Sequence, residues 1–201
     1  ALDYYKDATR LSNAGNAYGF HKFYVYDSPQ PLGFYYYRDT MPKIAPVLNL
    51  NLSLETGEIY TLFLSGPMDN LDTLLIKEHI PVFETTDSTT AFRFVNLSND
   101  APVSVNLKGE PYGSLISSLP YKGVSPFFKY PVVYDTPPYE FEVRDAATGE
   151  LLATYKDADM NGAAGKKHRW LQESRNHVFY GIRGVVSGAN KPQVRGFYDN
   201  Y

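Results

Sequence analysis

The sequence predicts an all-β protein built from two tandem immunoglobulin-like antiparallel β-sandwiches, and three observations predict it. The 201 residues include 18 Tyr and 12 Phe, which favour strands, together with 15 Gly and 14 Pro, which favour turns. Apolar and polar residues alternate in several segments, whereas no segment carries a sustained apolar stripe at helical spacing. Turn signals recur about every 8 to 12 residues, as is typical of sandwich folds.

In the first half, the segment 48–54 alternates leucine with asparagine or serine, as a strand does when one face meets a core. The alternation continues over 60–64, after the Gly-containing turn 55–58. We therefore expect these two segments to form a hairpin. Segment 74–80 is also expected to be a strand.

The second half contains the same kind of alternation, and its turns are clearly marked. Residues 145–149 end in glycine and predict a hairpin turn, and the segment 27–31 uses proline at the corresponding place. The strands expected in this half cover 92–96, 103–107, 127–130, 139–144, 151–155 and 178–182.

The chain also resembles itself when it is shifted by 118 residues. Without a gap, 23–66 falls on 141–184, and Gly66 falls on Gly184. In this alignment Trp170 takes the place of the core-facing Leu52, so we expect the indole to be at least partly buried. These matches indicate a duplication.

The duplication divides the chain into a first repeat (1–83), a polar linker (84–90) and a second repeat (91–201). Residues 91–118 of the second repeat have no counterpart, so the first repeat lacks its opening strands. Those strands are expected upstream, or Leu2–Lys6 and the linker close a reduced sandwich, or another subunit donates a strand.

Composition excludes several classes of function. The net charge of −3 argues against a general attraction to nucleic acid or to anionic membranes. The apolar runs are far shorter than the about 20 residues that span a bilayer, so no transmembrane segment is expected. The absence of cysteine excludes disulfides, thiolate metal sites and cysteine nucleophiles.

We assign no catalytic, cofactor-binding or metal-ligating residue, and we expect no cofactor. His168 and His177 lie on neighbouring predicted strands, but a sheet-surface position explains them better than a metal site that has no third ligand. Asp100, with the acidic pair at 157 and 159, suits turn capping better than Ca²⁺ binding, since no calcium loop frames it. The basic run 166–169 is expected to be a solvated loop.

Aromatic side chains are the unusual feature of this sequence. On a strand, the run 34–37 must turn two of its rings away from the core. Exposed tyrosines suit stacking on sugars or on partner surfaces, although cross-strand pairing within the sheet explains them equally well. The candidate ligand-binding residues are Tyr35, Tyr36 and Tyr121.

The segment 93–102 reads R-F-V-N-x-S-x-D-A-P. It resembles the opening of a β-sandwich domain of unknown function found, usually in tandem, in secreted proteins and lipoproteins of Bacteroidetes-like bacteria. The resemblance covers 91–184 and, through the shift, the first repeat as well. In this motif polar side chains are expected to satisfy backbone groups of the turn after the first strand, a structural role. The fold-motif residues are Arg93, Asn96, Ser98, Asp100 and Pro102.

The resemblance implies an extracytoplasmic protein of the cell envelope, secreted or held by a lipid anchor upstream of Ala1, and no enzyme. We therefore expect a non-catalytic interaction module of the adhesin type, whose partner is a protein or glycan at the cell surface. One alternative is a glycan-binding accessory protein that uses exposed tyrosines. A second alternative is a fibre or pilus-type subunit completed by a donated strand.

Overall fold

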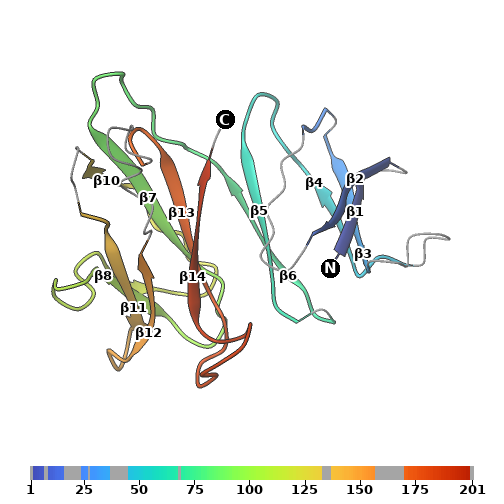
Figure 1. Ribbon diagram of the computed structural model, residues 1–201. Coiled ribbons are helices and arrows are strands. Elements are labelled where there is room, and N and C mark those ends of the chain that lie inside the picture. Colours follow the sequence, from blue (N-terminus) through green and yellow to red (C-terminus); the bar gives the residue numbers. More distant parts are fainter. Residues whose placement is uncertain are drawn as a thin grey trace. The chain divides into compact units, whose positions relative to one another are not determined.

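The computed structural model describes residues 2–6, 9–15, 24–26, 28–36, 45–67, 69–132, 137–156 and 170–199. Every regular element in these ranges is a β-strand, which confirms the all-β prediction (Figure 1). None of these residues forms a helix long and apolar enough to cross a membrane. The chain divides into two compact units, Ala1–His79 and Ile80–Tyr201, and each is described by itself.

The first unit contains a four-stranded antiparallel sheet and a two-stranded one. The larger sheet has the order β2-β1-β3-β4 and the smaller one pairs β5 with β6. The strands are β1 (Leu2–Lys6), β2 (Thr9–Gly15), β3 (Gln30–Tyr36), β4 (Leu48–Leu52), β5 (Tyr60–Ser65) and β6 (Asp72–Lys77).

Leucines from both sheets form the core of the first unit. Leu32 and Phe34 of β3 are buried, and half-buried leucines of β4 and β5 pack against them. The predicted hairpin of 48–54 with 60–64 is therefore wrong. The turn at 55–58 exists, but it carries the chain from one sheet to the other, so that the leucines of β4 and β5 contribute from different sheets to one core.

The segment 24–26 also differs from what the 118-residue shift predicts. The shift aligns this segment with part of the strand expected at 139–144, so a strand would be expected here too. The segment forms no strand, and Tyr24 and Tyr26 are both 84% exposed. The reason lies in β3, which already pairs with β1 on one edge and with β4 on the other. Leu2–Lys6 thus occupies the place that 24–26 would need.

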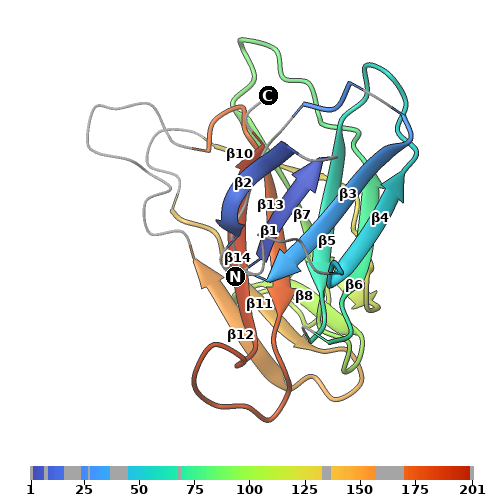
Figure 2. The ribbon, with the colours of Figure 1, turned by 90° about the vertical axis from the view of Figure 1, so that its right-hand side faces the viewer.

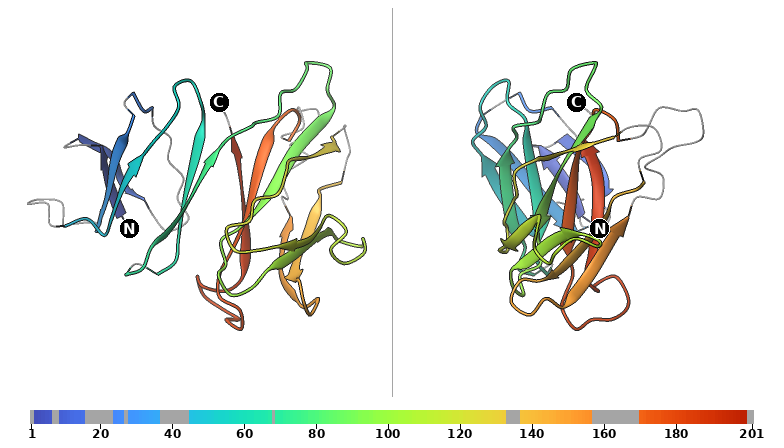
Figure 3. Two further views of the ribbon diagram at one scale, coloured as in Figure 1. Left: turned by 180° about the vertical axis from the view of Figure 1, so that it is seen from behind. Right: turned by 90° about the vertical axis from the view of Figure 1, so that its left-hand side faces the viewer.

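The second unit is a sandwich of two four-stranded sheets, which Figure 3 shows from two further directions. One sheet has the order β10-β7-β13-β14 and the other the order β12-β11-β8-β9. Their strands are β7 (Thr89–Asn96), β8 (Val103–Leu107), β9 (Ile116–Leu119), β10 (Phe128–Pro131), β11 (Glu140–Asp145), β12 (Leu151–Lys156), β13 (Ser174–Tyr180) and β14 (Gln193–Asp199).

Aromatic rings fill the core between these two sheets. Phe92 and Phe141 are completely buried, with ring centroids 4.8 Å apart in an edge-to-face arrangement. Trp170 is also completely buried, which confirms the expectation for this residue. The whole cluster comprises Phe92, Phe94, Val103, Val105, Leu119, Val132, Phe141, Val143, Trp170 and Phe179.

The C-terminal hairpins of the two units share one register. Leu62 pairs with Leu75 in the first unit, and Tyr180 pairs with Gln193 in the second, so the 118-residue shift carries one pair onto the other. The backbone angle φ is positive at both equivalent glycines, +88° at Gly66 and +76° at Gly184. Only glycine adopts this conformation readily, which explains why the residue recurs.

The segment 84–90, which the sequence predicts to be a linker, makes specific contacts. Thr89 and Thr90 belong to β7. The Gln172 side-chain amide lies within 3.0 Å of the carbonyl oxygens of Glu84, Thr85 and Asp87. This amide therefore holds the chain where it enters the second sandwich.

Candidate functional site

The fold-motif residues of β7 face a strand that lies far away in the sequence. β7 and β13 run parallel in a fixed register, so that Arg93 lies opposite Asn176. The buried Arg93 donates a hydrogen bond from Nε to Asn176 Oδ1 (2.6 Å), and its guanidinium lies 4.7 Å from the centre of the Phe127 ring. A buried guanidinium thus has a hydrogen-bond acceptor and an aromatic face.

Asn96 and Ser98 shape the turn that follows β7. Asn96 donates from Nδ2 to the Leu119 carbonyl (3.0 Å) and accepts the Ser98 N–H at Oδ1 (2.9 Å). The Ser98 hydroxyl donates to the Gly181 carbonyl at 2.9 Å. These side chains satisfy backbone groups, as Asn and Ser do in turns.

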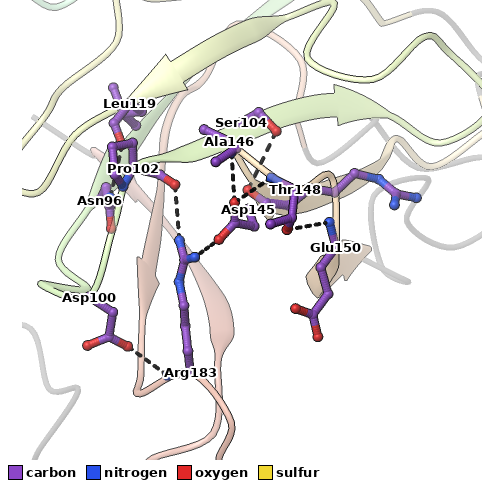
Figure 4. A network of polar contacts seen from close by, with 12 residues as sticks. Asn96, Asp100, Pro102, Ser104, Leu119, Asp145, Ala146, Thr148, Glu150 and Arg183 are labelled. Carbon is purple, nitrogen blue, oxygen red and sulfur yellow. Dashed lines mark hydrogen bonds and ion pairs between the residues drawn. The ribbon is translucent and has the colours of Figure 1, made fainter.

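Asp100 and Pro102 meet an arginine that the sequence analysis did not single out. Asp100 Oδ2 accepts the backbone N–H of Arg183 at 2.6 Å, and the Pro102 carbonyl accepts from Arg183 Nη2 at 3.0 Å. Arg183 also forms an ion pair with Asp145, and both side chains are largely buried. Figure 4 shows this guanidinium between Pro102 and Asp145.

Asp145 in turn organises the turn between β11 and β12. Its Oδ1 accepts the N–H groups of Ala147 (2.7 Å) and Thr148 (2.8 Å). The Tyr112 hydroxyl lies 2.9 and 2.6 Å from the carbonyl oxygens of Asp145 and Ala146. This is the hairpin turn that the sequence predicted at 145–149.

We call the three loops 97–102, 145–150 and 181–192 the Arg183 loop cluster. They meet at one end of the second sandwich, where Arg183 contacts the other two loops directly. Val186 within the cluster is 91% exposed and Ile182 is 50% exposed. The cluster therefore combines a fixed polar base with apolar side chains in solvent.

A constant spacing along the chain relates the motif residues to their partners. Four polar contacts join residues exactly 83 positions apart, since β7 and β13 are parallel and in register. The pairs are Thr90 with Glu173, Arg93 with Asn176, Ser98 with Gly181, and Asp100 with Arg183. The motif residues were visible in the sequence, but their partners in and beside β13 were not, because the spacing has meaning only once β7 and β13 are known to pair.

The predicted ligand-binding tyrosines do not all belong to one unit. Tyr35 is on β3 of the first unit and is half-buried, with its ring lying close to the Cα of Gly33. Tyr121 belongs to the second unit, and the Lys122 ammonium lies 5.6 Å from its ring centre. The side chain of Tyr36 is outside the described residues.

His177 is not the sheet-surface residue that the sequence suggested. It is completely buried, because its ring points into the aromatic core between the two sheets, against Phe94 and Phe141. Burial and, to a smaller extent, the Arg175 charge lower the pKa of His177 to about 3. His168, Asp157, Asp159 and the basic run 166–169 lie outside the described residues, and the described ones contain no acidic or histidine cluster fit for a metal ion.

An open hollow of about 510 Å³ lies beside the turn between β8 and β9. Lys108 and Glu140 at its rim form an ion pair at 2.8 Å, and the Lys108 ammonium holds the pKa of Glu140 below its usual range. These two charges compensate each other, so neither is available as a general acid or base. Its lining residues are Leu107, Lys108, Glu110, Pro137, Pro138, Tyr139 and Glu140.

The sequence matches no family model and no curated protein.

Proposed function

We propose that the chain is a non-catalytic interaction module of the bacterial cell envelope, of the adhesin type, and that the Arg183 loop cluster is its contact surface. The opening motif at 93–102 supports the cellular location through the resemblance described above. The loop cluster supports the kind of function, because loops on a rigid sandwich are a common place for binding residues.

The observation that carries this proposal is the contrast between the base and the tip of the cluster. At the base, Arg183 is tied to Asp100, Pro102 and Asp145. At the tip, Val186 projects 91% of its surface into solvent. A preorganised loop loses little conformational entropy on binding, and an exposed apolar side chain supplies contact area to a protein partner.

A matched pair of substitutions tests the contact surface. Val186→Asp should weaken saturable binding of the fluorescently labelled chain to intact producing cells by at least about tenfold, as for a central contact residue. Val82→Asp is the control, because Val82 is 82% exposed and lies in the same unit but outside the cluster. Flow cytometry measures both variants, and an equal response to the two would contradict the assignment.

The location has a separate test. A protease added to intact producing cells should remove the chain from the cells, as shown by immunoblot, while a cytoplasmic marker persists. A chain that is cut only after lysis would exclude surface exposure.

A glycan-binding role is the second candidate, and the exposed tyrosines of the first unit favour it. Tyr24 and Tyr26 are each 84% exposed, and such rings stack on sugars. A glycan array separates the two candidates. Saturable glycan binding that Tyr35→Ala or Tyr24→Ala abolishes would support this role, whereas binding lost in Val186→Asp alone would support the loop cluster.

A further inference from the structure

The strand β4 borders the four-stranded sheet of the first unit, at its right-hand margin in Figure 2. Within the described residues it pairs with β3 alone. A border strand presents N–H and C=O groups that can pair with another strand. Natural proteins usually protect such borders with charges, proline, bulges or short length.

β4 lacks each of these protections. It has five residues in regular pairing with β3, and the sequence contains no charged residue from Ala45 to Leu54. Each of the other edge strands of the three four-stranded sheets has at least one of these protections. β2 contains Arg10, β10 contains Lys129 and Pro131, β12 contains Lys156, β14 contains Arg195, and β9 has only four residues with irregular pairing.

The apolar face of β4 is also incompletely covered. Leu48, Leu50 and Leu52 are half-buried, although Leu32 and Phe34 on the adjacent β3 are buried. The apolar layer therefore thins toward the border of the sheet. A further strand alongside β4 would complete the burial of these three side chains.

We propose that β4 is a self-association edge, at which two copies of this chain pair their β4 strands antiparallel about a two-fold axis at Leu50. The strand L-N-L-N-L reads the same in both directions. Leu48 then lies opposite Leu52 of the second copy, and Asn49 lies opposite Asn51. The two copies bring together no like charges, and the leucine layers of the two sheets become continuous. This edge belongs to the first unit, whereas the Arg183 loop cluster belongs to the second.

A charge exchange tests this pairing on the full chain. Asn49 and Asn51 are exposed, so substitutions there leave the core intact. The chain should dimerise in sedimentation equilibrium at concentrations up to about 1 mM, since a single strand pair gives modest affinity. The double variants Asn49→Lys/Asn51→Lys and Asn49→Glu/Asn51→Glu should each dimerise at least about tenfold more weakly, because like charges then lie opposite each other. An equimolar mixture of the two should dimerise again.

Ser117→Lys/Ser118→Lys is the matched control, because both serines are exposed on the border strand β9. This variant should dimerise like the unmodified chain. Circular dichroism establishes that each variant is folded.

Cysteine pairing gives a second readout that does not depend on the charged variants. The chain has no cysteine, so introduced thiols can pair only with each other. Residues directly opposite on antiparallel strands are about 4.5 to 5.5 Å apart at Cα, within disulfide range. Mixed Asn49→Cys and Asn51→Cys chains should therefore cross-link faster than either chain alone.

Four results would overturn the proposal. They are a monomer at about 1 mM, unchanged dimerisation of the Lys variant, no preference for the mixed cysteine pair, and species that grow beyond the dimer with concentration. The last result would instead indicate head-to-tail strand donation.

Discussion

His177 lies at the centre of the aromatic core of the second unit, with ring centroids of Tyr155, Phe141 and Phe94 at 4.7, 5.1 and 5.2 Å. Neither ring nitrogen has a hydrogen-bond partner among the described residues. A proton on this imidazole would place a charge in an apolar environment, next to the charge of Arg175, so the folded state keeps the ring neutral. The residue therefore makes folding sensitive to acid.

The direction of this effect follows from the pKa of His177 in the two states. In the unfolded chain the imidazole takes up a proton near pH 6.5, and in the folded protein only near pH 3. The stability contribution is thus complete above pH 6.5 and is lost as the pH falls from 6.5 toward 3. Between pH 7 and pH 5 the loss amounts to about 2 kcal/mol.

His177→Phe should remove this part of the acid sensitivity, because phenylalanine binds no proton and suits the aromatic surroundings. Urea unfolding followed by Trp170 fluorescence at pH 7 and pH 5 measures it. The drop in unfolding free energy should be about 2 kcal/mol smaller in the variant than in the parent chain. An unaltered slope in His177→Phe would show that other groups cause the acid sensitivity.

At the scale of elements, strands were easier to predict than their partners. Alternation placed β8 (103–107) correctly to the residue and β11 and β12 to within one residue at each end, since a strand between core and solvent has period two. The parallel pairing of β7 with β13 was not predicted, because register between distant strands depends on the whole sandwich. The same limitation explains the wrong hairpin of β4 with β5.

The Arg183 loop cluster depends on one side chain that joins three loops. Arg183→Ala removes the ion-pair partner of the largely buried Asp145 carboxylate, so the free energy of unfolding should fall by about 1 to 3 kcal/mol. Arg183→Lys should recover little of this loss, since a single ammonium cannot bind Asp145 and the Pro102 carbonyl in the same geometry.

Urea unfolding followed by Trp170 fluorescence measures these variants. Arg195→Ala is the control, because Arg195 is exposed on β14 and should change the stability by no more than about 0.5 kcal/mol. Equal losses in Arg183→Ala and Arg195→Ala would mean that the contacts of Arg183 contribute no stability of their own.

At the scale of the whole molecule, composition was enough to predict the all-β class, because the many Tyr, Phe, Gly and Pro residues and the period of two point the same way. The self-similarity at 118 residues found the shared register of β5–β6 and β13–β14. It did not predict β1 and β2, because the larger sheet of the first unit has a different strand order from either sheet of the second unit. Arg183 was missed because its role exists only once three distant loops meet.

The two units differ in how much apolar surface their described residues bury. In the first unit Leu32 and Phe34 form the buried centre, surrounded by half-buried leucines, whereas the second unit has a large cluster of buried aromatic and aliphatic side chains. Apolar burial is the main favourable contribution to folding, so the first unit should be the less stable one. We therefore expect two thermal transitions rather than one.

Trp170 makes the two transitions separable, because the single tryptophan lies in the core of the second unit. Differential scanning calorimetry should show a transition at lower temperature that leaves Trp170 emission unchanged, followed by one in which the emission shifts to the red. Leu32→Ala should lower only the first transition, because it removes about 2 to 5 kcal/mol of core packing from the first unit alone. Val143→Ala in the second core should lower only the second transition. A single transition that coincides with the change in Trp170 emission, and that both substitutions move equally, would show that the two units unfold together.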